Sequence, residues 1–253
     1  MFCVQIAGVL VAVENRYAFT ERLCADYIVD VSPDECAFSV SATPEEIAAE
    51  NNDEDAFSPA YCESLALYRK MCTRLLDYDA FLFHAAVVSY AGRGYAFAAK
   101  SGTGKSTHVA QWMHALGDRV MVVNGDKPIL RWCGGEGAGA AAGSGAFLAY
   151  GTPYCGKESW GQNASVPLRA VCFIERCEPG ERDCLRRLED DGEIINRMMN
   201  QILLPKDPIL AVRQLDLLDK LVTCVPFYVL RCTPTRAAFD AAFQMTLCDN
   251  ENE

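Results

Sequence analysis

Short apolar runs and amphipathic stretches alternate along this chain of 253 residues, and their order predicts a mixture of strands and helices. Apolar runs of about four to eight residues between turn residues are typical of strands, whereas apolar positions recurring every three or four residues indicate helices. The runs predict strands at 2–13, 26–40, 81–90, 95–99, 119–123, 129–132, 147–150, 166–174 and 226–232. The amphipathic stretches predict helices that begin at Pro44 and Pro59, and further helices over 105–116, 183–203, 208–222 and 235–247.

The order of these elements indicates the fold class. Strands and helices are mixed without regular strand–helix–strand units or an internal repeat, which favours an α/β (α+β mixed) fold with a mixed sheet flanked by helices. We expect residues 1–78 to form a β-rich N-terminal region with a helix packed on the core, and 79–253 to form the main domain. The Gly/Ala-rich segment 134–145 has too few packing side chains for a core and predicts a mobile hairpin or loop.

The segment between the strand at 95–99 and the helix from Lys105 carries the most specific chemistry. It reads Ala99, Lys100, Ser101, Gly102, Thr103, Gly104, Lys105, Ser106, Thr107, a P-loop (Walker A) pattern with Ala99 in place of the first Gly. Backbone N–H groups of such a loop hold nucleotide phosphates, the Lys reaches the β- and γ-phosphates, and the following hydroxyl holds Mg²⁺. The pattern therefore predicts ATP and Mg²⁺ as ligands of residues 101–107; the alternative is a Gly-rich turn that merely caps a helix.

Composition limits the classes of partner and the compartment. There are 23 basic and 34 acidic residues, a net charge of −11, which argues against nucleic acid and anionic membranes as partners. The thirteen Cys lack Cys-x-x-Cys spacing and accompany only three His, so no structural zinc site is expected. With an apolar N-terminus that resembles a strand more than a signal peptide, these thiols favour the cytoplasm.

Three further positions are candidates for the reaction itself. Asp126 follows the strand at 119–123, where a carboxylate could hold Mg²⁺ or accept the proton of an attacking hydroxyl, although Asn124-Gly125 is also a hairpin signal. His84 lies on the strand before the loop strand, where a buried structural His is the alternative. The polar segment 151–158 offers Lys157 for phosphate and Glu158 for metal, or forms an ordinary surface turn; its Cys155 has no activating partner in the sequence.

These residues together resemble a known family. His84, the Ser101–Ser106 loop, Gly117 and the Gly125-Asp126 pair resemble the catalytic domain of HPr kinase/phosphorylase, a member of the phosphoenolpyruvate-carboxykinase-like P-loop superfamily. The likeness covers about 81–128, and the whole chain resembles HPr-kinase-like proteins from gut bacteria. It implies that Lys105 and Ser106 bind ATP-Mg²⁺, that His84 lies near the transferred phosphate, that Asp126 matches the second Asp of the family's pair, and that the chain forms a homo-oligomer.

The resemblance breaks at one position. The family carries an Asp pair at the end of the strand after the loop helix and uses the first Asp as general base, whereas this chain has Gly125 there. Either Asp126 does both jobs, or Glu158 substitutes, or phosphoryl transfer is impaired. The family's C-terminal segment is not recognisable, so neither phosphorylase activity nor HPr as substrate is expected.

The function that follows is an ATP/Mg²⁺-dependent serine kinase with catalytic residues Lys105, His84 and Asp126, acting on a small protein or peptide. Two alternatives stay open. Gly125 favours a nucleotide-binding sensor or pseudokinase, and a small-molecule kinase would use the same loop.

Overall fold

Two sheets and seven α-helices make up the part of the chain that the computed structural model describes, residues 1–51, 57–134, 145–178 and 181–247. The N-terminal region contains β1 (Phe2–Ile6), β2 (Val9–Glu14), α1 (Ala18–Leu23), β3 (Phe38–Ser41), α2 (Pro44–Ala49) and α3 (Pro59–Leu75). The middle of the chain contains β4 (Ala80–Leu82), β5 (Ala85–Tyr90), β6 (Arg93–Ala98), α4 (Lys105–Leu116), β7 (Val120–Asn124), β8 (Ile129–Cys133) and β9 (Ala146–Tyr150). The rest contains β10 (Ser165–Arg176), β11 (Cys184–Leu188), α5 (Asp191–Met198), α6 (Pro208–Cys224), β12 (Phe227–Cys232) and α7 (Arg236–Phe243).

The larger sheet has nine strands and is mixed, as the sequence predicts. Its main path runs β4-β8-β9-β10-β6-β5-β7, with β12 and β11 added beside β10. The long strand β10 joins two parts of this sheet, because its first residues pair antiparallel with β9 and its last residues pair parallel with β12. Strand β6, which leads into the Gly-rich segment, pairs parallel with β10 and antiparallel with β5.

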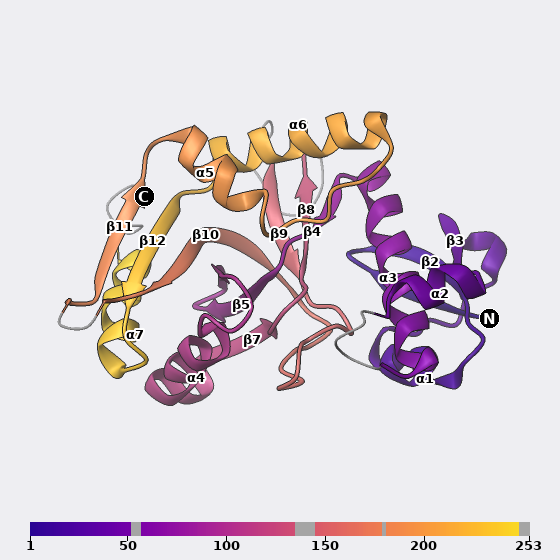
Figure 1. The fold of residues 1–253 in the computed structure, drawn as a ribbon, viewed down its shortest axis with the longest axis horizontal. Coiled ribbons are helices and arrows are strands. Elements are labelled where there is room, and N and C mark those ends of the chain that lie inside the picture. The colour runs from indigo at the N-terminus through magenta and orange to yellow at the C-terminus, as the bar shows by residue number, and fades with distance from the viewer. Residues whose placement is uncertain (52–56, 135–144, 179–180, 248–253) are drawn as a thin grey trace.

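Helices cover both faces of this sheet. Figure 1 shows α4 and α7 below the strands and α5 and α6 above them. Side chains of β6 alternate between the two faces, as the period of a strand requires. Tyr95 and Phe97 pack with Trp112 of α4, whereas Ala96 and Ala98 belong to the core under α5 and α6.

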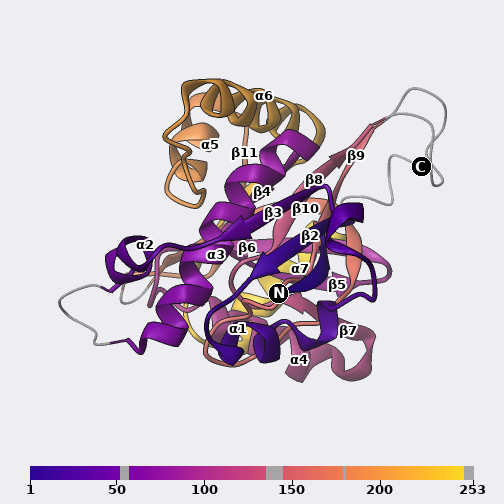
Figure 2. The same cartoon turned by 90° about the vertical axis from the view of Figure 1, so that its right-hand side faces the viewer.

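The N-terminal region lies at one end of the larger sheet. Figure 2 shows the three-stranded sheet β1-β2-β3 and helix α3 together in front of the larger sheet. Helix α3 begins at Pro59 after the N-cap Ser58, and α2 begins at Pro44 with the predicted capping box of Thr43 and Glu46. The separation into regions at residue 78 stays a prediction.

Several predicted elements are wrong in detail. The predicted strand at 26–40 is wrong except at its end, where Phe38–Ser41 form β3. The part before β3 contains two 3-10 turns, Ala25–Tyr27 and Pro33–Glu35, and a capping box of Ser32 and Glu35 fixes the second turn. The predicted helix at 183–203 begins instead with strand β11, which pairs with β12, and only α5 is helical. Helix α1 was not predicted, and the predicted strand at 81–90 is interrupted before Ala85.

Two more sequence predictions concern loops and membranes. Most of the Gly/Ala-rich segment, 135–144, lies outside the described residues, as do positions 52–56 of the predicted polar loop. Among the helices that are described, none combines the length and the apolar character needed to span a membrane.

Candidate functional site

The Gly-rich segment Ala99–Gly104, here called the glycine loop, connects β6 to the first turn of α4. Gly102 and Gly104 have φ values of 77° and 126°, in the region that L side chains rarely adopt. Helix α4 then begins at Lys105, and His108 N–H donates to the Gly104 carbonyl at 2.9 Å. The predicted strand–loop–helix context of the motif is therefore confirmed. The backbone N–H groups of the glycine loop and the positive end of the α4 dipole therefore lie together where the loop enters α4.

His84 lies between the glycine loop and Asp126 because of strand order. Strand β5 runs antiparallel to both of its neighbours, with Ala85 opposite Ala98 of β6 and Val87 opposite Asn124 of β7. The residue just before β5 is thus next to the ends of both neighbouring strands. His84 Nε2 lies 3.1 Å from Asp126 Oδ1 and 3.0 Å from Lys105 Nζ.

Lys105 is buried and its charge is costly there. Its side chain donates to the Ala99 carbonyl at 3.1 Å as well as facing His84. Burial lowers the pKa of Lys105, and the carboxylates of Asp126 and Glu158 offset only part of this shift. A nearby anion, such as a phosphate group, would stabilise the charged form of Lys105 and raise its pKa again.

Asp126 is held in its position by the buried side chain of Asn124. Asn124 Oδ1 accepts from the N–H groups of Asp126 at 2.9 Å and Lys127 at 2.7 Å, and its amide nitrogen donates to the Thr152 carbonyl at 3.1 Å. The alternative hairpin at Asn124-Gly125 is wrong, since β7 pairs with β5 while β8 pairs with β4 and β9.

The carboxyl of Asp126 favours the ionised form. Burial raises its pKa, but the hydrogen bond from His84 and the charges of His84, Lys127 and Lys105 outweigh burial, and the net pKa shift is downward. Asp126 is therefore an acceptor-only carboxylate at neutral pH, as both metal binding and proton acceptance require.

Gly125 has no room for a side chain. A Cβ at this position would lie 2.7 Å from the Cys155 carbonyl oxygen and 3.1 Å from that of Trp160. The close approach of the 155–160 segment therefore leaves no space at position 125 for the Asp side chain that the resembled family carries there. Burial, with Asp126 nearby, raises the pKa of the Cys155 thiol to about 11, so this thiol is not an activated nucleophile.

One cavity of ≈ 440 Å³ brings the predicted residues together. His84, Asp126 and the residues Ser101, Gly102, Gly104, Lys105, Ser106 and Thr107 line it. Thr103 lines the two neighbouring cavities instead. The segment 156–158, which the sequence left open between a functional loop and a surface turn, lines the same cavity with Lys157 and Glu158.

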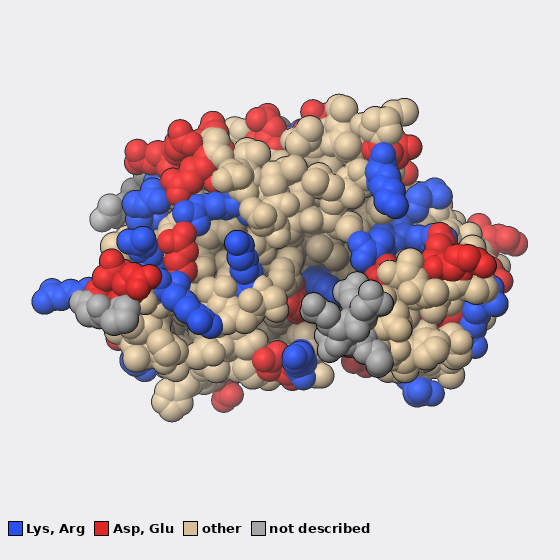
Figure 3. All heavy atoms as spheres, viewed as in Figure 1, with Lys and Arg blue, Asp and Glu red and all other residues tan. Residues whose placement is uncertain are grey.

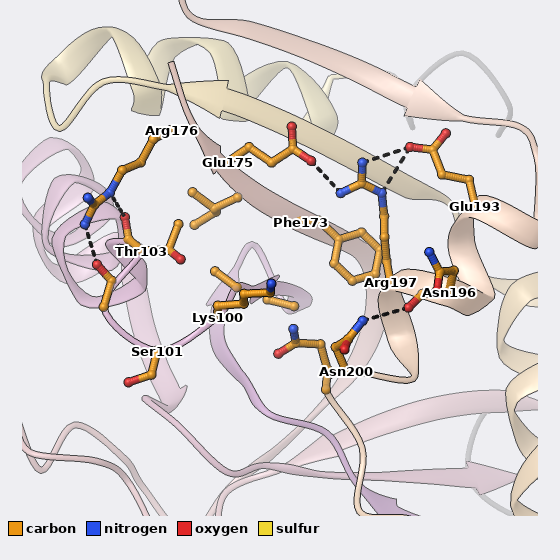
Figure 4. A pocket seen from close by; sticks show the side chains of 15 residues that line it. Lys100, Ser101, Thr103, Phe173, Glu175, Arg176, Glu193, Asn196, Arg197 and Asn200 are labelled. Carbon is orange, nitrogen blue, oxygen red and sulfur yellow. Dashed lines mark hydrogen bonds and ion pairs between the residues drawn. The ribbon is translucent and has the colours of Figure 1, made fainter. Parts of the chain in front are cut away.

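Arg176 is a residue of this site that the sequence analysis missed. Figure 4 looks into an adjoining cavity of ≈ 690 Å³ and shows Arg176 reaching from the end of β10 to the glycine loop. Its guanidinium donates to the carbonyls of Gly102 and Thr103. The sequence does show a basic residue at the end of an apolar strand. Only the pairing of β10 with β6, however, shows that this residue lies beside the glycine loop.

Comparisons with known proteins add little to this geometry. No protein-family model matches the chain, and no curated protein matches it in sequence. Among solved structures it is similar to the HPr(Ser) kinase/phosphatase from Coxiella burnetii, with 10% sequence identity and a TM-score of 0.32 over 67% of this chain and 89% of that chain. A likeness at this level decides neither fold nor function, which depend on the residues themselves.

Proposed function

We propose that this chain is an ATP/Mg²⁺-dependent phosphotransferase that phosphorylates a serine hydroxyl on a small protein or peptide. The observation that carries the proposal is the convergence of Lys105, His84 and Asp126 within hydrogen-bond distance at the start of α4. Phosphoryl transfer needs cations on the phosphates and a carboxylate near the attacking hydroxyl, and these residue types supply both.

The phosphates would bind to the glycine loop. Its N–H groups and the N-terminus of α4 provide donors, and Lys105 would exchange its bond to the Ala99 carbonyl for phosphate oxygens. The Ser106 hydroxyl and the Asp126 carboxylate line one cavity, and Mg²⁺ needs only one or two protein ligands when phosphates and water complete its coordination. When bound, Mg²⁺ supplies charge neutralisation on the β- and γ-phosphates.

The nucleoside would lie in a cavity of ≈ 390 Å³ on the outer side of the loop, between α4 and the ends of β10 and β12. Buried His108 lines it, and burial lowers the pKa of this His to about 4, so its ring is neutral. Trp112 donates to His108 Nε2 at 3.0 Å, which leaves the ring proton on Nδ1. Nδ1 is buried without a partner among the described residues, so His108 presents a neutral ring to this cavity.

In the transfer step, the acceptor hydroxyl oxygen forms a bond to the γ-phosphorus while the bond from that phosphorus to the β,γ-bridging oxygen breaks. The hydroxyl proton passes to the Asp126 carboxylate, and ADP leaves with its charge neutralised by Lys105. Since Gly125 has no side chain, Asp126 is the carboxylate assigned to the proton.

The test is transfer of γ-labelled phosphate from ATP-Mg²⁺ into the proteins and peptides of a lysate from the source organism. We expect a labelled band with the wild type and with Lys220→Ala, a control at an exposed position of α6, and none with Lys105→Ala. Absence of label from the wild type would overturn the kinase proposal.

A second function is favoured by Gly125. If the wild type binds ATP by calorimetry but labels nothing, the chain is a nucleotide sensor, and the missing side chain at 125 explains the lost transfer. Failure to bind ATP would contradict both functions.

A further inference from the structure

A groove separates helix α3 from the extended segment 200–207, and it leads to His84. Two cavities form it, of ≈ 520 Å³ and ≈ 450 Å³, and both are lined by Arg69 and Leu203. The outer cavity reaches Lys206, and the inner one reaches His84. A path therefore runs from the surface to the residues assigned to phosphoryl transfer.

The groove is cationic in a strongly acidic protein. Among the described residues that line it are two carboxylates, Glu50 and Asp207, and five basic side chains, Arg69, Lys70, Arg74, Lys127 and Lys206, whereas the chain carries a net charge of −11. Figure 3 shows Lys and Arg side chains gathered over α3 and the segment before α6. This concentration of charge is complementary to an acidic ligand.

Part of this charge is already compensated and part is free. Arg69 binds Glu50 through two nitrogens, Lys70 lies 2.7 Å from Glu46, and Arg74 lies 3.8 Å from Asp77. Lys127 and Lys206 have no carboxylate partner among the described residues. These two ammonium groups lie at the inner and outer parts of the groove, and an acidic side chain would gain most at these positions, although the charge of Lys127 also acts on Asp126.

Gln201 lies at the inner end of the groove, between it and the cavity beside the glycine loop. This residue is 5% exposed, and its side-chain oxygen is buried without a hydrogen-bond partner. Its backbone carbonyl accepts from His84 N–H at 2.6 Å, which fixes it beside the site. A buried unpaired amide oxygen is costly, and a ligand N–H would satisfy it.

We propose that this groove binds the acceptor as an extended peptide segment carrying Asp or Glu side chains, with its hydroxyl directed to His84 and Asp126. The inference rests on the proposed kinase function and names where its substrate docks. Apolar Leu65, Leu82 and Leu203 line the inner cavity between the charges, a mixture that suits alternating side chains of a peptide rather than a small anion.

The experiment measures fluorescence anisotropy of a fluorescein-labelled peptide of Glu-Ala-Ser repeats, with a Lys-Ala-Ser repeat as the comparison peptide. The groove variant is Arg74→Glu with Lys206→Glu. The control variant, Arg22→Glu with Arg187→Glu, makes the same charge change on exposed residues outside both cavities. Thermal melts of both variants verify that they fold.

We expect the acidic peptide to bind the wild type and the control, to bind about ten-fold or more weakly to the groove variant, and to weaken with added salt. Gln201→Leu should weaken binding of the acidic peptide. Equal binding by both variants, or equal binding of both peptides, would overturn the proposal. A wild-type dimer that only the groove variant dissociates would overturn it too, by showing a contact between copies.

This outcome is separable from that of the kinase proposal. Anisotropy needs no nucleotide, so the groove can fail while Lys105-dependent labelling stands. Conversely, peptide binding without transfer of label would support the proposed peptide-binding groove and contradict the proposed kinase activity.

Discussion

Lys105 Nζ and Asp126 Oδ1 both face the same nitrogen of His84, at 3.0 and 3.1 Å. An imidazole nitrogen either carries a proton and donates, or lacks one and accepts. His84 Nε2 therefore bonds to Lys105 in one tautomer and to Asp126 in the other. A phosphate that draws Lys105 away would leave His84 free to donate to Asp126, which links nucleotide binding to the orientation of the carboxylate.

Removing the charge of Asp126 tests its role in proton transfer. Asp126→Asn keeps the size of the side chain but cannot accept the hydroxyl proton. We expect phosphate transfer to fall about 10²–10⁴-fold while ATP binding persists at reduced Mg²⁺ dependence. Labelling kinetics and calorimetry measure the two effects, with exposed Asp118→Asn as the control. Unchanged transfer by Asp126→Asn would move the role of base to another group.

The lowered pKa of Asp126 predicts a pH dependence of stability. Its folded pKa lies below the unfolded value of about 3.9, so its contribution is fully present above that value and is lost as pH falls through the folded pKa. Thermal melts of the wild type and Asp126→Asn should differ most near pH 6 and converge as pH falls below about 4. A difference that grows toward acid pH would contradict the assigned shift.

Lys105 should destabilise the nucleotide-free protein. Burial lowers its pKa, which means that its charged form is penalised in the fold. Lys105→Met removes the charge and keeps the apolar stem, so we expect the Tm without nucleotide to rise by about 2–4 °C and ATP to lose its stabilising effect. Scanning calorimetry with and without ATP-Mg²⁺ provides the measurement. A lower Tm in the absence of ATP would show that the bonds to Ala99 and His84 outweigh burial.

Gly125 should tolerate no side chain. Gly125→Ala brings its methyl against the Cys155 carbonyl, and the 155–160 segment must shift. We expect a loss of about 1–3 kcal/mol in the free energy of unfolding and weaker phosphate transfer. Gly192→Ala in α5 is the control, because its Cβ would meet only the Asp190 side chain, at 3.2 Å, and no backbone; helix propensity should offset this contact and leave stability nearly unchanged. Denaturant unfolding compares the two, and equal stabilities would refute the close approach.

Arg176 should support the glycine loop. Arg176→Ala removes two hydrogen bonds to the Gly102 and Thr103 carbonyls from an exposed side chain. ATP affinity should fall about ten-fold with little change in Tm, because the loop loses preorganisation while the core is untouched. Calorimetric titration measures this, and Arg182→Ala is the exposed control. Unaltered ATP affinity would leave Arg176 without a role in the loop.

The sequence by itself determined the elements whose signals are local. Glycines at 102 and 104, the apolar run before them and the helical pattern from Lys105 define the glycine loop, and proline after a capping residue marks the starts of α2 and α3. These signals suffice because a turn, a cap and an amphipathic period depend on residues close together in the chain.

Only the tertiary structure decided the features that depend on strand pairing and on contacts between distant segments. Residues 184–188 read as helix, but pairing with β12 makes them a strand, since an open sheet edge overrides weak local preference. The order β6-β5-β7 brings His84 to Asp126 across 42 positions, and the approach of Cys155 to Gly125 excludes a carboxylate there. No local pattern encodes these relationships, because each is a distance between strands or loops set by how the whole sheet packs.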